Sequence, residues 1–85
     1  MDKVGFIEIN IKGSKGNLDF DFSDLVTLMK QLGFQHRVKG SHNIFYRNLI
    51  VEIINIQPGR ENKAKPYQVK QIRNLILKYQ LKTEV

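Results

Sequence analysis

The sequence lacks cysteine, and it contains only two histidines among its 85 residues. Without cysteine the chain can form no disulfide framework, no thiolate zinc site and no catalytic thiolate. Its longest apolar runs fall far short of the roughly 20 residues that span a bilayer. The N-terminus also lacks the charged start and apolar block of a signal peptide. These absences predict one small cytoplasmic domain, with no membrane partner, that is stabilised by packing.

Acidic residues are scarce in the second part of the chain. Residues 1–35 carry four basic and five acidic side chains, whereas residues 36–85 carry ten basic and three acidic ones. Their net charges are therefore −1 and +7. A one-sided positive charge favours an anionic partner, either nucleic acid or an acidic protein. An ordinary solvated surface is the alternative interpretation.

The N-terminal stretch FIEINIK, residues 6–12, alternates isoleucine with polar side chains, which predicts a half-buried strand. Residues 13–17 supply turn-forming side chains, and residues 18–22 alternate apolar and acidic side chains. This pattern favours a β-hairpin as an N-terminal extension.

A helix and three strands are predicted next. Ser23 is a suitable N-cap for a helix that continues to about Leu32, and Gly33 is a suitable left-handed stop. Three stretches typical of an antiparallel meander follow, at residues 34–39, 43–47 and 49–56. Because the third stretch is apolar on both faces, we expect the N-terminal hairpin or another protein to cover its second face.

A second helix is predicted from Pro66, because proline suits the first helical position. Apolar side chains recur at helical spacing in Val69, Ile72, Ile76 and Tyr79. The opposite side of this helix is basic. The element order predicts an α+β fold with both helices on one face of a three-stranded sheet.

Three stretches carry a resemblance: LGFQHRVKGSHNIF, EIINIQ and KAKPYQVKQIRNLILKY. Through them the chain from about Phe20 onward resembles the HicA family of toxins from bacterial type II toxin–antitoxin systems. The resemblance implies an αβββα fold similar to the double-stranded RNA-binding domain. It divides the single domain, residues 1–85, into an N-terminal β extension at 1–21 and a core at 22–82.

The resemblance also implies an activity. HicA toxins cleave messenger RNA without a metal or other cofactor, and a HicB antitoxin holds them inactive. The histidine of the Gly-Ser-His triplet is their catalytic residue, which corresponds to His42 in this chain. Many relatives have a second histidine directly afterwards, where this chain has Asn43.

RNA cleavage suits the residues around His42. The ribose 2′-OH is the nucleophile, so the reaction needs a base for its proton and cations for the developing charge. His42 is the candidate base, and Arg37 and Lys39 are the nearby cations. The acid for the leaving oxygen stays open among water, Lys39 and the imidazole itself. An ordinary polar residue at the start of a strand is the alternative interpretation of His42.

The remaining candidates are binding residues. Gly40 and Ser41 predict a tight turn whose amides are suited to meeting a phosphate. Lys63, Lys65 and Lys70 surround an acid-free helix start, which favours a bound RNA backbone. Arg73, on the basic side of the same helix, is a further RNA-binding candidate. A solvated lysine face is the alternative.

His36 shares a strand face with Phe34 and Val38, which predicts half-buried packing. Two histidines at this spacing, without carboxylates around them, make a poor metal site. Two functions therefore stand beside each other: a metal-independent endoribonuclease and a non-catalytic module that binds double-stranded RNA. The sequence leaves the oligomeric state open.

Overall fold

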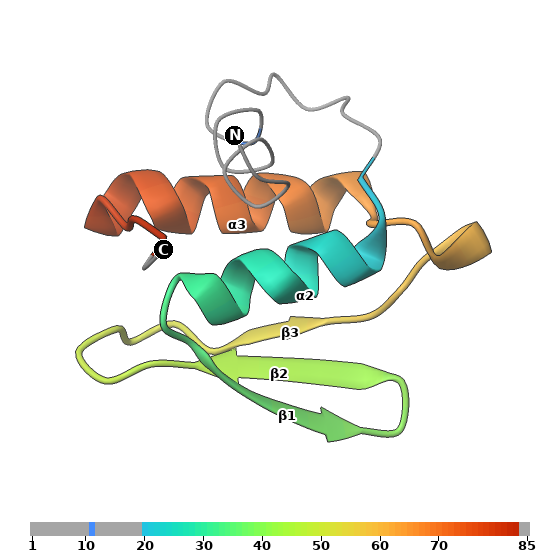
Figure 1. Cartoon of the computed structure of the whole chain (residues 1–85), viewed down its shortest axis with the longest axis horizontal. Coiled ribbons are helices and arrows are strands. Elements are labelled where there is room, and N and C mark those ends of the chain that lie inside the picture. Colours follow the sequence, from blue (N-terminus) through green and yellow to red (C-terminus); the bar gives the residue numbers. More distant parts are fainter. Residues whose placement is uncertain (1–10, 12–19, 84–85) are drawn as a thin grey trace.

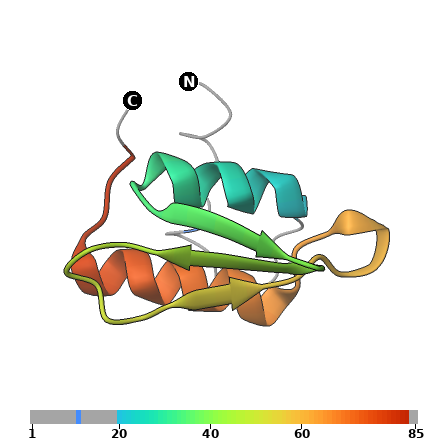
Figure 2. The same ribbon diagram turned by 90° about the horizontal axis from the view of Figure 1, so that it is seen from below.

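The computed structural model describes residue 11 and residues 20–83. The elements are α2 (Phe22–Gln31), β1 (Gln35–Lys39), β2 (His42–Tyr46), β3 (Ile54–Ile56), the 3-10 helix η1 (Arg60–Asn62) and α3 (Pro66–Tyr79). Both helices lie on one face of the antiparallel sheet, whose order is β1-β2-β3 (Figure 1). Both also begin at the end of the molecule where β1 turns into β2 (Figure 2). The predicted α+β fold with an αβββα order is confirmed.

Helix α2 begins earlier than the capping pattern predicts. Asp21, which has an extended backbone, is the N-cap, and Ser23 lies inside the first turn. The predicted Ser23 cap is therefore wrong. Burial of Phe22, which is 6% exposed, favours a helix start that brings this ring into the core. The Ser23 carbonyl instead accepts a hydrogen bond from the Thr27 hydroxyl at 3.0 Å.

The end of α2 is as predicted. Gly33 has a φ of 91°, a left-handed conformation that glycine adopts without a steric penalty. The amide of Gly33 donates to the Lys30 carbonyl at 3.0 Å, and the amide of Phe34 donates to the Met29 carbonyl at 3.1 Å. This pair of hydrogen bonds is a Schellman motif, and it directs the chain into β1.

The strand register assigns each side chain to one face of the sheet. Phe45 lies opposite His36 on β1 and Ile54 on β3, and Asn43 lies opposite Ile56. Because successive strand residues point to opposite faces, these residues share the inner face, which the helices cover. The outer face, directed away from the helices, carries Gln35, Arg37, Lys39, His42, Ile44, Tyr46 and Asn55.

The core fills the space between the helices and the inner face. Its buried apolar residues are Ile11, Phe20, Phe22, Leu25, Leu28, Met29, Leu32, Phe34, Phe45, Ile54, Ile56, Val69, Ile72, Leu75, Ile76 and Leu81. Among the residues that the structure describes, no helix has the length and apolar character needed to cross a membrane.

The third strand is shorter than predicted. Only residues 54–56 of the predicted stretch 49–56 pair with β2. Leu49 has a φ of 71°, and the Ile50 amide donates to the Arg47 carbonyl at 3.2 Å, so the chain is still turning there. Val51 and Ile53 are 88% and 65% exposed. The described residues therefore leave Leu49, Val51 and Ile53 exposed. The cover that we expected over this second apolar face is not found among the described residues.

Most of the predicted N-terminal hairpin lies outside the described residues. Ile11 is described, and it is helical and fully buried, so the strand prediction is wrong at this residue. Ile7 and Ile11 are four apart in sequence, a spacing that suits a helix as well as the alternation suits a strand. Further along, the Phe20 carbonyl accepts a hydrogen bond from the Ala64 amide at 2.8 Å. This bond joins the segment before α2 to the segment before α3.

Candidate active site

His42 is the first residue of β2, directly after the two-residue turn Gly40–Ser41. Gly40 has a φ of 61° at the first turn position, the pattern of a type II′ hairpin turn, which matches the twist of the strands. The predicted tight turn is therefore present. Lys39 is the direct partner of His42 across the turn, and both side chains are exposed on the outer face.

The imidazole of His42 is oriented through one nitrogen. Its Nδ1 lies 3.2 Å from the Asn55 Oδ1 and 3.4 Å from the Gln57 Nε2. The Gln57 Oε1 in turn accepts a hydrogen bond from the Ser41 hydroxyl at 3.3 Å. Nε2 of His42 makes no hydrogen bond with the described part of the chain, and the side chain as a whole is exposed.

Asn55 and Gln57 are site residues that the sequence reasoning missed. Both come from the EIINIQ stretch, where they alternate with the buried Ile54 and Ile56. This alternation of amide and buried apolar residues is the sequence pattern that could have identified them. Asn55 is at the exposed position of the strand that pairs with His42's own strand, and Gln57 directly follows that strand, so both amides come close to the imidazole.

Two predicted cations accompany His42 on the outer face. Lys39 lies opposite His42, and Arg37 lies two residues further along β1 on the same face, a separation of roughly 7 Å along a strand. The structure thus brings together His42, Arg37, Lys39 and the Gly40–Ser41 turn. A phosphate beside the imidazole would have positive charge on one side.

His36 has different surroundings, on the inner face. Its ring stacks on Phe45 with the centroids 4.5 Å apart and an interplanar angle of 5°. Its Nε2 lies 2.8 Å from the Asn43 Oδ1. The predicted half-buried packing is confirmed, although the main partner is Phe45 across the strands, and Val38 is 63% exposed.

Asn43 also lies on the inner face, so its side chain is directed away from that of its neighbour His42. A histidine at this position would share the face of His36. The departure from the family pattern at Asn43 therefore leaves the outer-face surroundings of His42 unchanged.

The other predicted RNA-binding residues lie beside η1 and along α3. Lys63 and Lys65 line an open groove together with Gly59, Arg60, Glu61, Ala64 and Pro66. Lys65 is the N-cap of α3, whose first turn has no acidic residue, whereas Lys70 and Arg73 lie further along that helix. Arg60 is a cation of the groove that the sequence reasoning missed.

Lys63 is already engaged within the chain. Its Nζ lies 2.8 Å from the Asp21 Oδ1, and the two residues also form an isolated β-bridge. The sequence reasoning missed this ion pair, because 42 residues separate the partners. Lys63 therefore contributes to joining the segment before α2 to that before α3 as well as to the charge of the groove.

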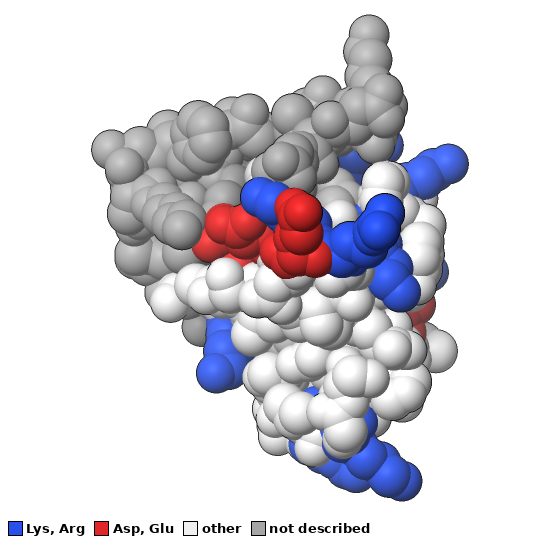
Figure 3. Space-filling view, turned by 90° about the vertical axis from the view of Figure 1, so that its right-hand side faces the viewer, with Lys and Arg blue, Asp and Glu red and all other residues white. Residues whose placement is uncertain are grey.

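Basic side chains are spread over one end of the molecule. Figure 3 shows blue Lys and Arg side chains beside acidic ones in the upper half of this end, with further blue side chains at the left and at the bottom, separated by uncharged side chains. The predicted basic binding residues thus form two groups, with Arg37 and Lys39 on the outer face of the sheet and Lys63 and Lys65 at the groove.

One family model matches this chain, described as "HicA toxin of bacterial toxin–antitoxin", and it covers residues 22–81. The chain belongs to the HicA toxin family. The comparisons with curated proteins and with solved structures found no match. The matched residues begin at the first residue of α2 and include the sheet, His42 and α3. Family membership gives the protein the role of the toxin in a toxin–antitoxin pairing.

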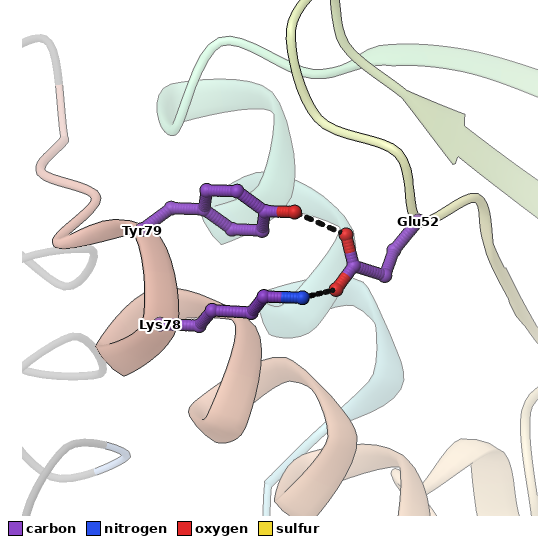
Figure 4. A network of polar contacts seen from close by, with 3 residues as sticks. All are labelled: Glu52, Lys78 and Tyr79. Carbon is purple, nitrogen blue, oxygen red and sulfur yellow. Dashed lines mark hydrogen bonds and ion pairs between the residues drawn. The ribbon is translucent and has the colours of Figure 1, made fainter.

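A further polar cluster of this HicA toxin lies at the opposite end from His42. Glu52 accepts a hydrogen bond from the Tyr79 hydroxyl at 2.5 Å and pairs with the Lys78 Nζ at 2.7 Å (Figure 4). The hydrogen bond from Lys78, followed by that from Tyr79, lowers the pKa of Glu52 from 4.5 to about 2. The same hydrogen bond to Glu52 raises the pKa of Lys78. The cluster fastens the segment before β3 to the last turn of α3.

Within residue 11 and residues 20–83, no three imidazole or carboxylate side chains are grouped in the way that a protein metal site requires.

Proposed function

We propose that this HicA toxin is an endoribonuclease that cleaves messenger RNA with His42 as its general base. One observation carries the proposal. The exposed imidazole of His42 is held through Nδ1 at the start of β2, Nε2 has no hydrogen bond with the described residues, and Lys39 lies directly opposite. The residue types, their common face and the family membership all favour chemistry on a phosphate chain.

In the proposed reaction, Nε2 of His42 takes the proton of a ribose 2′-OH. The 2′-oxygen forms a bond to the adjacent phosphorus, and the bond from phosphorus to the 5′-oxygen of the next nucleotide breaks. A proton goes to that leaving oxygen. The products are a 2′,3′-cyclic phosphate and a 5′-hydroxyl end, and Lys39 and Arg37 stabilise the negative charge that builds on the phosphate.

Binding of the RNA is assigned to both basic groups. Gly40 and Ser41 bring the backbone close to the phosphate beside His42, and the groove cations with Lys70 and Arg73 hold the chain further away. A HicB-type antitoxin is the proposed protein partner. The proposed domain has its catalytic core in residues 22–82 and an extension in residues 1–21, and its proposed location is the cytoplasm.

Incubation of the pure protein with RNA in excess chelator tests the activity. Fragments that end in 2′,3′-cyclic phosphate would support the metal-independent nuclease. RNA that is shifted on a gel but stays intact would instead support a non-catalytic RNA-binding module. The decisive control is a His42→Ala protein purified in parallel, which excludes a contaminating ribonuclease.

A further inference from the structure

Two amides make opposite demands on one nitrogen of His42. The Asn55 Oδ1, at 3.2 Å from Nδ1, is a hydrogen-bond acceptor and requires a proton on Nδ1. The Gln57 Nε2, at 3.4 Å from the same nitrogen, is a donor and requires a lone pair there. A neutral imidazole satisfies only one of them, so the two contacts favour different tautomers.

The orientation of Gln57 follows from Ser41. A serine hydroxyl donates to the Gln57 Oε1 at 3.3 Å, which turns the NH₂ group of this amide toward His42. Gln57 therefore presents a donor to Nδ1. Asn55 lies on the outer face opposite Ile44, two residues from His42 along β2, and presents the closer contact.

We propose that Asn55 is a positioning residue that selects the Nδ1–H tautomer of His42, and that Gln57 favours the opposite tautomer. This inference rests on the proposed function in one respect: the Nδ1–H tautomer is the one that leaves the lone pair on Nε2, where the 2′-OH proton is taken. In this arrangement a carbonyl oxygen of a side-chain amide orients the base, as carboxylates and backbone carbonyls orient many functional histidines.

The hydrogen bond to Asn55 persists through the proton transfer. When Nε2 gains the proton of the 2′-OH, the imidazolium still donates from Nδ1 to the Asn55 Oδ1, and this bond is strengthened because the donor is now charged. The donor of Gln57 has no acceptor on either the Nδ1–H tautomer or the imidazolium. Asn55 thus assists the base and its product, whereas Gln57 opposes both.

The test is a measurement of the tautomer in the RNA-free protein. Nitrogen-15 chemical shifts distinguish the two ring nitrogens, and the His42→Ala spectrum assigns the signals, because the chain has only two histidines. The spectra are recorded at about pH 8.5, where histidine side chains are ordinarily neutral. We expect Asn55→Ala to increase the Nε2–H tautomer of His42 and Gln57→Ala to increase the Nδ1–H tautomer. Asn55→Asp, which keeps an acceptor, should retain Nδ1–H.

These outcomes separate positioning from a structural effect. A general loosening of the strand would not move the tautomer in opposite directions in two neighbouring variants. An unchanged tautomer in Asn55→Ala, or a shift in the same direction in both alanine variants, would overturn the proposal. The matched control is Asn74→Ala, an exposed amide on α3, which should leave the His42 signals unchanged.

Kinetics provide the second readout. Asn55→Ala should lower kcat for RNA cleavage by about 10- to 100-fold, as the loss of an orienting partner does elsewhere, with KM nearly constant. Asn55→Asp should restore most of kcat and shift the pH profile upward, because an anionic acceptor favours the imidazolium. If Asn55→Ala shifts the tautomer while His42→Ala still cleaves RNA as fast as the parent, the role of Asn55 is supported but the general-base function of His42 is overturned. An unmoved tautomer overturns the Asn55 role whatever the cleavage rate.

Discussion

The two histidines lie on the same pair of strands but on opposite faces of the sheet. His36 is half-buried on the inner face, where its ring stacks on Phe45 and its Nε2 contacts Asn43. His42 is exposed on the outer face, held by two amides through Nδ1 and accompanied by Lys39 and Arg37. Each ring has polar partners at one nitrogen, and the side chain of His42 is the more exposed of the two.

The difference shows how the alternation of side chains along a strand gives one histidine a packing role and leaves the other exposed. Six positions separate the histidines in sequence, and a straight strand would put both on one face. The Gly40–Ser41 turn reverses the chain between them, and its pairing of Lys39 with His42 places His42 on the face of Arg37 and Lys39. The turn therefore decides which histidine is available for chemistry.

The largest effect should come from His42. His42→Ala should lower the rate of RNA cleavage by at least about a hundredfold, because the general base is lost. The thermal midpoint and the affinity for RNA should stay close to those of the parent, since the ring is exposed. Cleavage is measured by the release of cyclic-phosphate ends from a defined RNA. A variant as active as the parent would contradict the assignment and favour the non-catalytic RNA-binding module.

His36 should show the reverse pattern. His36→Ala removes the ring that stacks on Phe45 and should lower the free energy of unfolding by about 1 kcal/mol. Cleavage at a temperature where the variant is folded should change little. Urea denaturation measures the first quantity. Loss of cleavage in a fully folded His36→Ala protein would contradict the assignment of His36 to packing and of His42 alone to catalysis.

A smaller effect is expected from the cations of the groove and of α3, which lie away from the outer face of the sheet. Lys65→Ala and Lys70→Ala should each reduce the salt dependence of RNA affinity, by about 0.7 in the slope of log K against log salt concentration for a single strand. Each should leave kcat close to that of the parent. Titration of a labelled RNA at several salt concentrations measures the slope. Lys63 is a poorer choice, because its replacement also breaks the ion pair with Asp21.

Lys30→Ala is the matched control for these cations, because Lys30 is exposed in the last turn of α2, at the other end of that helix from the groove. It should leave the slope unchanged. Equal slopes in the parent and the Lys65→Ala, Lys70→Ala double variant would show that the groove side does not hold RNA.

Local patterns in the sequence predicted most of the fold. The apolar stripe of α3, the stop at Gly33 and the turn at Gly40 each depend on residues within a few positions, and each is present. The errors depend on distant contacts. Alternation predicted a third strand from residue 49, but pairing with β2 decides where it starts, and the turn at Leu49 delays it to Ile54.

The site divides in the same way. Residue type and resemblance predicted His42 and its cations, whereas Asn55 and Gln57 become visible only when the register places β3 beside β2. The pairing of Lys63 with Asp21 depends on where the segments before the two helices meet. Sequence patterns indicate which residues have useful chemistry, and register decides which of them meet.

The smallest predicted effect lies away from both histidines, at Glu52. Because the hydrogen bonds from Lys78 and Tyr79 lower the pKa of this carboxyl from 4.5 to about 2, the folded state binds its proton less readily than the unfolded state. Its contribution to stability is therefore fully present above about pH 4.5 and is lost as the pH falls toward 2. Glu52→Gln should be less stable than the parent at pH 7 and equally stable near pH 2.

Thermal midpoints of both proteins across this range measure the difference. Glu61→Gln, the same change at an exposed carboxyl of η1, should show no such convergence with pH. Cleavage by Glu52→Gln at pH 7 should equal that of the parent, because Glu52 belongs to the segment before β3, and His42 begins β2 at the opposite end of the sheet (Figure 1). A constant gap between the parent and Glu52→Gln from pH 7 to pH 2 would mean that the ionised carboxylate is not what fastens the segment before β3. A fall in cleavage would mean that this end of the molecule also controls the outer face.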